Sequence, residues 1–163
     1  MKEKGQSLIE VLVALGVSVI IITAIVMSVV LAIVNAQFAK SQNLATSYAR
    51  QGMELIRQLS RSNWTAFNNY SNTDYCLGSN NVLEEKALLP NGECPKNVGN
   101  FIREVQIDHN SDSCQIAQSP ANYGSKVTVT IYWNDSKCGS DSIFCHQVGL
   151  DSCLQNINAV PTP

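Results

Sequence analysis

The chain has 163 residues, with 11 Lys and Arg against 13 Asp and Glu, so its formal net charge is -2. This balance gives no basic field that would favour nucleic acid, and the length allows one modest domain beside an N-terminal segment. The sequence contains no nucleotide-binding loop, hydrolase elbow or zinc-protease motif, so we expect neither an enzyme nor a cofactor.

An apolar run from Val11 to Val34 follows a short charged start. Its 24 residues include no Lys, Arg, Asp or Glu, and as a helix with a rise of about 1.5 Å per residue they would cross a bilayer core of about 30 Å. The apolar region of a secretory signal peptide is shorter, typically about 7–15 residues. Lys2 and Lys4 precede the run and favour an orientation with the N-terminus inside the cell. We therefore expect a single-pass membrane helix with an extracytoplasmic domain after it.

A lone acid, Glu10, stands at the start of this run, five residues after Gly5. The residues around it read KEKG, then QSLIE, then unbroken apolar sequence. This pattern resembles the prepilin signal of type IV pilins and type II secretion pseudopilins. The resemblance implies that prepilin peptidase removes residues 1–5 as a leader, cleaves after Gly5 and methylates the new amine. Gln6 would then be the first mature residue, a position where the family usually has Phe or Met.

Glu10 needs a physical reason to lie beside a membrane span. A charged carboxylate in hydrocarbon costs about 2.5–3.5 kcal/mol on insertion scales, and such groups persist when they are paired. The resemblance implies that Glu10 pairs with the N-terminal amine of a neighbouring subunit during filament assembly, where a buried pair penalises a wrong register. The alternative is that Glu10 lies at the level of the lipid headgroups and has no role.

The periodicity changes after the apolar run, which with the residues before it forms the expected transmembrane half, 6–34. In 35–61, apolar or small residues recur at steps of three or four, which is typical of an amphipathic helix: Phe38, Ala45, Tyr48, Ala49, Gly52, Leu55, Ile56 and Leu59. No proline occurs from residue 6 to residue 61. We expect one continuous helix that ends at Ser62 and Asn63, with Gly52 allowing close packing against a domain.

The remaining chain divides into a loop and a sheet. We expect 62–100 to be irregular, with one short helical candidate at 82–89. The alternating patterns at 101–108, 126–134 and 142–150 predict three strands, in 101–163, that form an antiparallel meander with one apolar face. The amphipathic helix is the expected cover for that face, so the fold class is α+β. This order of elements is also the type IV pilin architecture, and the strand segments look most like the V-type minor pilins, the pilus modification proteins.

All the cysteines lie after the apolar segment: Cys76, Cys94, Cys114, Cys138, Cys145 and Cys153. An even number of cysteines beyond a membrane span indicates an oxidising compartment and a disulfide framework. Cys76–Cys94 would tether the long loop. The meander places Cys114 and Cys153 at one end of the sheet, and Cys138–Cys145 would close a short loop, although six cysteines allow many other pairings.

Three further residues or segments have competing interpretations. Arg103 falls on the apolar face of its strand, where it would pair with Glu54, pair with a neighbouring subunit, or, as we prefer, extend to solvent from a strand near an edge. The segment 108–112 is rich in oxygen ligands but lacks the glycine and distal Glu of an EF-hand, which favours a solvated turn. His146 beside Cys145 would suit a nucleophile or a zinc ligand, but a disulfide is favoured for Cys145.

The leading hypothesis is a structural subunit, a minor pilin or pseudopilin of a type IV pilus or type II secretion-like filament. Its partners would be other pilin subunits, prepilin peptidase and the lipid of the inner (cytoplasmic) membrane. The protein would reach a filament or the cell surface after assembly. The alternative is a signal-anchored, disulfide-rich extracytoplasmic binding domain or enzyme that does not polymerise.

Overall fold

The computed structural model describes residues 4–109, 111–114, 124–135, 138–139 and 144–156. The backbone falls into two compact units, Met1–Ser41 and Gln42–Pro163. The described part of the first unit is helical throughout. The second unit combines the C-terminal part of the same helix with an antiparallel sheet, so the expected α+β class is confirmed.

The long helix α1 runs from Lys4 to Ser62, 59 residues without a break. It ends where the sequence predicts, because Asn63 has an extended backbone and begins the next helix instead. The Asn63 side chain accepts a hydrogen bond of 2.9 Å from the amide of Ala66, which caps α2 (Trp64–Asn68). A single residue thus separates the two helices.

The sheet has five strands in the order β2-β1-β3-β4-β5, and every neighbouring pair is antiparallel. The strands are β1 (Asp74–Leu77), β2 (Leu83–Glu85), β3 (Ile102–Asp108), β4 (Ser125–Trp133) and β5 (His146–Leu154). Three short 3₁₀ turns accompany them, η1 (Lys86–Leu88), η2 (Pro90–Gly92) and η3 (Asp112–Cys114). Strands β3, β4 and β5 form the expected meander.

Two predictions about the strands were wrong. The segment 62–100 is not simply irregular, since it supplies α2, β1 and β2, and the helical candidate at 82–89 is β2 followed by η1. Strands of three or four residues are too short to show an alternating pattern, so pairing with a neighbour decides their conformation. The third predicted strand is displaced: β5 begins at His146, and positions 142–143 lie outside the described residues.

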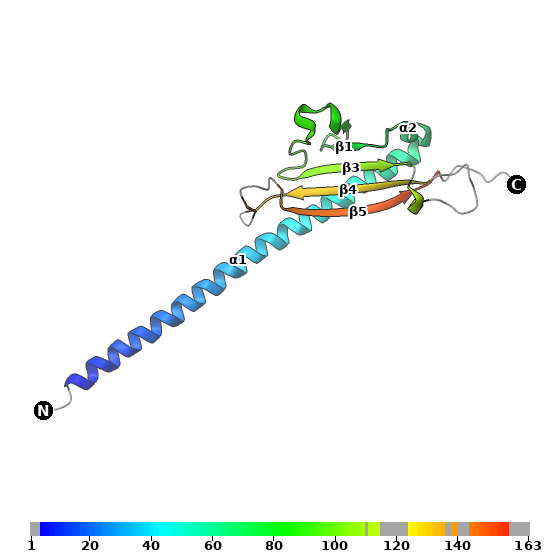
Figure 1. Ribbon diagram of the computed structural model, residues 1–163. Coiled ribbons are helices and arrows are strands. Elements are labelled where there is room, and N and C mark those ends of the chain that lie inside the picture. The colour runs from blue at the N-terminus through cyan, green and yellow to red at the C-terminus, as the bar shows by residue number, and fades with distance from the viewer. Residues whose placement is uncertain (1–3, 110, 115–123, 136–137, 140–143, 157–163) are drawn as a thin grey trace. The chain divides into compact units, whose positions relative to one another are not determined.

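The core of the second unit lies between α1 and one face of the sheet (Figure 1). Strand β4 alternates as predicted, with Val127, Val129, Ile131 and Trp133 all buried. The facing stripe of α1 is also buried, and its members are Ala45, Ala49, Gly52, Met53 and Ile56. A Cβ at Gly52 would come within 3.1 Å of a Val129 methyl carbon, so the glycine lets helix and sheet approach closely.

Candidate functional site

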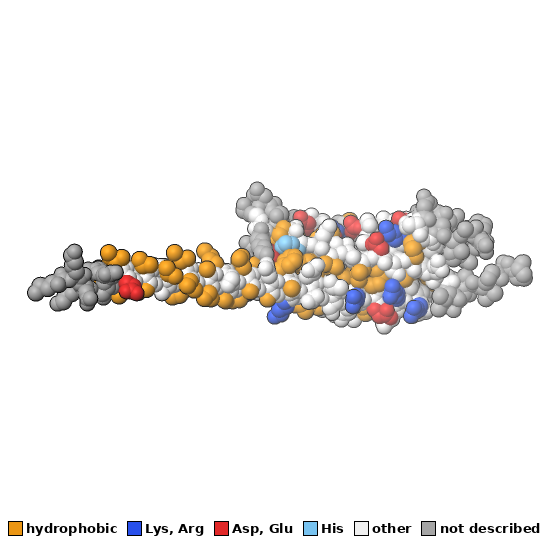
Figure 2. Space-filling model, turned by 90° about the horizontal axis from the view of Figure 1, so that it is seen from below, with side chains coloured by type: hydrophobic (Ala, Val, Ile, Leu, Met, Phe, Trp, Pro, Cys, Tyr) orange, Lys and Arg blue, Asp and Glu red, His pale blue; other side chains and the backbone are white. Residues whose placement is uncertain are grey.

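The first unit is a helix that is apolar on every side. Its large apolar side chains from Leu8 to Ile33 are all between 50% and 69% exposed, and Figure 2 shows them covering the visible face of this segment. It is the one described helix long and apolar enough to cross a membrane. Such a surface requires a cover of lipid or of other apolar helices. The helix therefore indicates single-pass membrane anchoring.

The hydroxyl groups within this apolar segment are satisfied by the helix itself. Ser18 Oγ donates to the Ala14 carbonyl at 2.7 Å, Thr23 Oγ1 to the Ile20 carbonyl at 2.9 Å, and Ser28 Oγ to the Ile25 carbonyl at 2.8 Å. Hydroxyl groups bonded in this way need no partner from lipid or from another chain. Among the described side chains of this segment, the carboxylate of Glu10 is then the group that hydrocarbon cannot accommodate at low cost.

The three residues expected to govern processing and assembly lie together on α1. Gly5 and Gln6 are in its first turn, and Glu10 is exposed one turn after Gln6. Residues four apart lie on the same face of a helix, so positions 6 and 10 share a face of α1.

The described cysteines all form disulfides, in the pairs expected from the sequence. Cys76 is bonded to Cys94, Cys114 to Cys153 and Cys138 to Cys145, with Cα atoms 5.6, 5.4 and 5.5 Å apart. Disulfides persist in oxidising compartments, which indicates that this domain is extracytoplasmic. Cys145 is thus a disulfide partner rather than a free nucleophile.

The location of Arg103 in the structure contradicts each of the three interpretations that the sequence suggested for it. Its strand, β3, is the central one of the sheet, and Arg103 is only 1% exposed, so it neither reaches solvent at an edge nor meets another subunit. Glu54 lies beside Arg57 instead, at 3.8 Å. The strand is central because the segment 62–100 adds β1 and β2 to it, which the sequence pattern did not show.

The Arg103 guanidinium binds four neutral oxygen atoms. Nε donates to the Leu77 carbonyl at 2.9 Å, and Nη2 donates to the Gly78 carbonyl, also at 2.9 Å. Nη1 donates to the Tyr48 carbonyl and to Gln51 Oε1, both at 3.3 Å. Burial lowers the pKa of Arg103 below its usual value. This one side chain thus joins α1, the end of β1 and β3.

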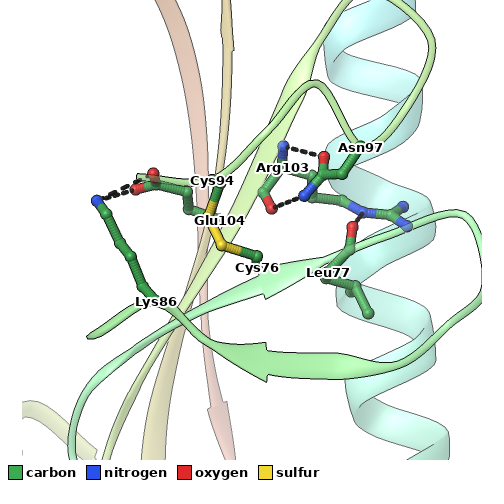
Figure 3. Close-up of a disulfide and its surroundings, with 7 residues drawn as sticks. All are labelled: Cys76, Leu77, Lys86, Cys94, Asn97, Arg103 and Glu104. Atoms are coloured by element: carbon green, nitrogen blue, oxygen red, sulfur yellow. Dashed lines mark hydrogen bonds and ion pairs between the residues drawn. A yellow bond between two sulfur atoms is a disulfide. The ribbon is translucent and has the colours of Figure 1, made fainter. Parts of the chain in front are cut away.

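The backbone of Arg103 is held from its other side by Asn97. The Asn97 side chain accepts from the Arg103 amide at 2.8 Å and donates to the Arg103 carbonyl at 3.0 Å, as Figure 3 shows. The β1–β3 ladder ends at Cys76 and Glu104. At Arg103, the next residue of β3, the Asn97 side chain therefore takes the place of β1 and satisfies backbone groups that would otherwise be unpaired.

A charged pair lies on the opposite face of β3, near the Cys76–Cys94 disulfide (Figure 3). Lys86 Nζ is 3.0 Å from Glu104 Oε1. Burial alone would lower the pKa of Lys86, but the hydrogen bond and the charge of Glu104 outweigh it and raise that pKa. Burial, and then the charge of Glu104, raise the pKa of Tyr132 beside them. With Glu93, Ile102 and Phe144, these residues line a shallow pocket of about 330 Å³.

The two histidines lie at opposite ends of β4. His109 Nδ1 is 2.6 Å from Ser125 Oγ and its Nε2 is 3.0 Å from the Tyr70 carbonyl, so its ring is bound within the domain. Of the predicted turn at 108–112, position 110 lies outside the described residues. His146 Nε2 is 3.2 Å from Asp135 Oδ1, and its ring stacks on Trp133 with centroids 5.4 Å apart.

Comparison of the chain with protein-family models, with curated proteins and with solved structures finds no match. The case for a function therefore depends on the chain's own residues and geometry. Sequence reasoning singled out Glu10, the cysteines and Arg103, but it gave Arg103 the wrong surroundings. Two features of the sequence could have indicated its burial. Arg103 falls on the apolar face of its strand, and Gly52 on the covering helix has no side chain, which leaves room for the arginine.

Proposed function

We propose that the protein is a structural subunit, a minor pilin or pseudopilin, of a type IV pilus or type II secretion-like filament. One observation carries the proposal: helix α1 is continuous from Lys4 to Ser62, apolar on every side in its first part and packed on a sheet in its second. This is the arrangement expected of a subunit that is stored in a membrane and then polymerises through its helix.

The physical basis is that the apolar helix would exchange one apolar environment, lipid, for another, the helices of neighbouring subunits. Lipid tails and the apolar side chains of sister helices offer the same kind of environment, so moving the helix between them costs little hydrophobic free energy. The hydroxyl groups of the segment are bonded internally and do not oppose the transfer. Glu10 is the exception. Cleavage after Gly5 by prepilin peptidase in the inner membrane would expose an amine on each subunit, and pairing of Glu10 with the amine of a neighbour would set the register of assembly.

The experiment compares Glu10→Ala with Glu54→Ala in the cells that make the protein. The first variant removes the only acid beside the apolar segment, and the second removes an exposed acid of the domain. We expect both variants to enter the membrane in normal amounts, because losing a carboxylate lowers the cost of insertion. We expect only Glu10→Ala to reduce the amount recovered in the filament fraction, by about tenfold or more, since an unpaired buried amine costs several kcal/mol.

Equal recovery of the two variants in filaments would refute the pairing role of Glu10. Absence of both the variants and the wild-type chain from every filament fraction would instead support a signal-anchored extracytoplasmic domain that does not polymerise.

A further inference from the structure

Four potential metal ligands gather where β4 and β5 are joined. Asp135 follows β4, His146 begins β5, and Cys138 and Cys145 lie in the connection. The ligand atoms of these four side chains all lie within 4.8 Å of one another, and this is the one such group in the part of the chain that the structure describes. The proposed function uses none of these residues.

Two of the four are held in position by the sheet. His146 pairs with Trp133 in the β4–β5 register, and its ring also stacks on the Trp133 side chain. Asp135 lies two residues beyond Trp133, and its Oδ1 is 3.2 Å from His146 Nε2. Groups fixed by a rigid scaffold bind a metal with a smaller ordering cost than groups on a free loop.

The two sulfur atoms are occupied by each other. A metal binds thiolates, and Cys138 and Cys145 are joined in a disulfide. Their bridge is nevertheless more accessible than the tether of the long loop, since Cys145 is exposed and Cys138 half-buried, whereas Cys76 and Cys94 are 3% and 4% exposed. The amide of Asp135 is 3.3 Å from Cys138 Sγ, close enough to stabilise a negative charge on that sulfur.

We propose that Asp135, Cys138, Cys145 and His146 form a zinc site that opens when the Cys138–Cys145 disulfide is reduced. Two thiolates, an imidazole and a carboxylate are the donor set that Zn²⁺ takes in tetrahedral sites, at distances of about 2.0–2.3 Å. Atoms that already lie within 4.8 Å of one another reach such distances by side-chain rotation once the sulfurs separate.

The reductant is a dithiol. Its first thiolate attacks the exposed sulfur of Cys145, the disulfide bond breaks, and Cys138 leaves as a thiolate and takes up a proton. The second thiol of the reductant resolves the mixed disulfide, which releases Cys145 as a thiol and oxidises the reductant to its own disulfide. Zinc binding then displaces the two thiol protons. The proposal does not depend on filament assembly.

The test uses the full chain in detergent micelles with Co²⁺ as a spectroscopic probe for the zinc site. After treatment with a limiting amount of a dithiol, we expect one Co²⁺ per chain, with tetrahedral d–d absorption and sulfur-to-cobalt charge-transfer bands. The oxidised chain should show neither. We expect His146→Gln and Asp135→Asn to weaken Co²⁺ binding by about tenfold or more, while the matched change Asp151→Asn at an exposed acid has no effect.

A second measurement identifies the sulfurs. Zn²⁺ added to the reduced chain should protect Cys138 and Cys145 from alkylation, as read by mass spectrometry of their peptides, and leave any other reduced cysteine reactive. The proposal is overturned if the reduced chain gives no tetrahedral cobalt spectrum, if the double variant Cys138→Ser/Cys145→Ser gives the same spectrum, or if all reduced cysteines are alkylated alike.

Discussion

Arg103 is a fully buried cation whose charge is met by neutral oxygen atoms. An apolar residue of similar size can often replace a buried ion pair without loss. Here, three of the four acceptors are backbone carbonyls, of Leu77, Gly78 and Tyr48, which no substitution elsewhere removes. The loss of the guanidinium would remove a charge-assisted hydrogen bond from each of them. The Gly78 carbonyl would still accept from the Asn81 amide, so the cost falls mainly on the buried Leu77 carbonyl, and a hydrogen bond of this kind contributes about 1.5–3 kcal/mol.

We therefore expect Arg103→Met to lower the free energy of unfolding by about 2 kcal/mol or more. The control is Arg50→Met, because Arg50 is an exposed arginine on the same helix that Arg103 binds. Thermal unfolding of the full chain in detergent, followed by near-ultraviolet circular dichroism, would measure both. A melting temperature for Arg103→Met equal to that of the control would contradict the role assigned to this side chain.

Gly52 provides a second test at the residue scale. Alanine is preferred over glycine in helices by about 1 kcal/mol, so in open space Gly52→Ala would stabilise the protein. A Cβ at this position would instead lie 2.9 Å from Arg103 Cδ and 3.1 Å from Val129 Cγ1, and the hydrogen bonds of Arg103 prevent its side chain from moving away. We expect Gly52→Ala to be net destabilising by about 1–3 kcal/mol.

Gly16→Ala is the matched control for this substitution, because a Cβ there meets nothing within 4 Å. The same thermal unfolding measurement should show no loss of stability for Gly16→Ala. A gain in stability for Gly52→Ala would mean that helix and sheet are less closely packed at this point than the structure indicates.

At the scale of the elements, the length of a segment decides how far its conformation follows from the sequence. Strand β4 has nine residues with strict alternation, and the buried face of α1 repeats at helical spacing, so both can be predicted from pattern alone. Strands β1 and β2 have four and three residues, too few for a period to be visible. The burial of Arg103 depends on β1, so it could not be predicted from the sequence pattern either.

The candidate functional residues also fall into two groups, those that the sequence alone indicates and those that depend on the pairing of strands. Glu10 is evident from the sequence because one charge stands beside a long apolar run. The cysteine pairs agree with the pairing expected from the loops and the strand order, although the sequence left many other pairings open. The proximity of Asp135 and Cys138 to His146 depends on the β4–β5 register, which pairs Trp133 with His146. Alternation alone does not specify this register, because any shift by two residues keeps the same side chains on the buried face.

The Cys76–Cys94 disulfide should account for much of the stability of the segment 62–100. Its two cysteines are 18 residues apart, and closing a loop of that length restricts the unfolded chain by about 3 kcal/mol, against about 2 kcal/mol for the 7-residue separation of Cys138 and Cys145. We expect Cys76→Ser/Cys94→Ser to lower the melting temperature of the full chain in detergent more than Cys138→Ser/Cys145→Ser. The reverse order would show that β1 and β2 remain in place without the tether.

At the scale of the whole molecule, the two units have opposite surfaces. The described part of the second unit buries its apolar side chains between α1 and the sheet and braces the fold with three disulfides. Among its described side chains, the first unit exposes nearly all the apolar ones and forms no core of its own. Its stability as a helix therefore depends on its surroundings, which are lipid in a membrane and, under the proposed function, sister helices in a filament.

The mature N-terminus of the polymerised protein tests this account most directly. Filaments sheared from the cells would be digested, and the first peptide of the chain sequenced by tandem mass spectrometry. We predict a chain that begins at Gln6, with or without a methyl group on its amine, because only then does each subunit present an amine to Glu10 of a neighbour. Filaments whose subunits still begin at Met1 would contradict it. So would a chain that begins near Ala36, because cleavage just after the apolar run is what a secretory signal peptide would give.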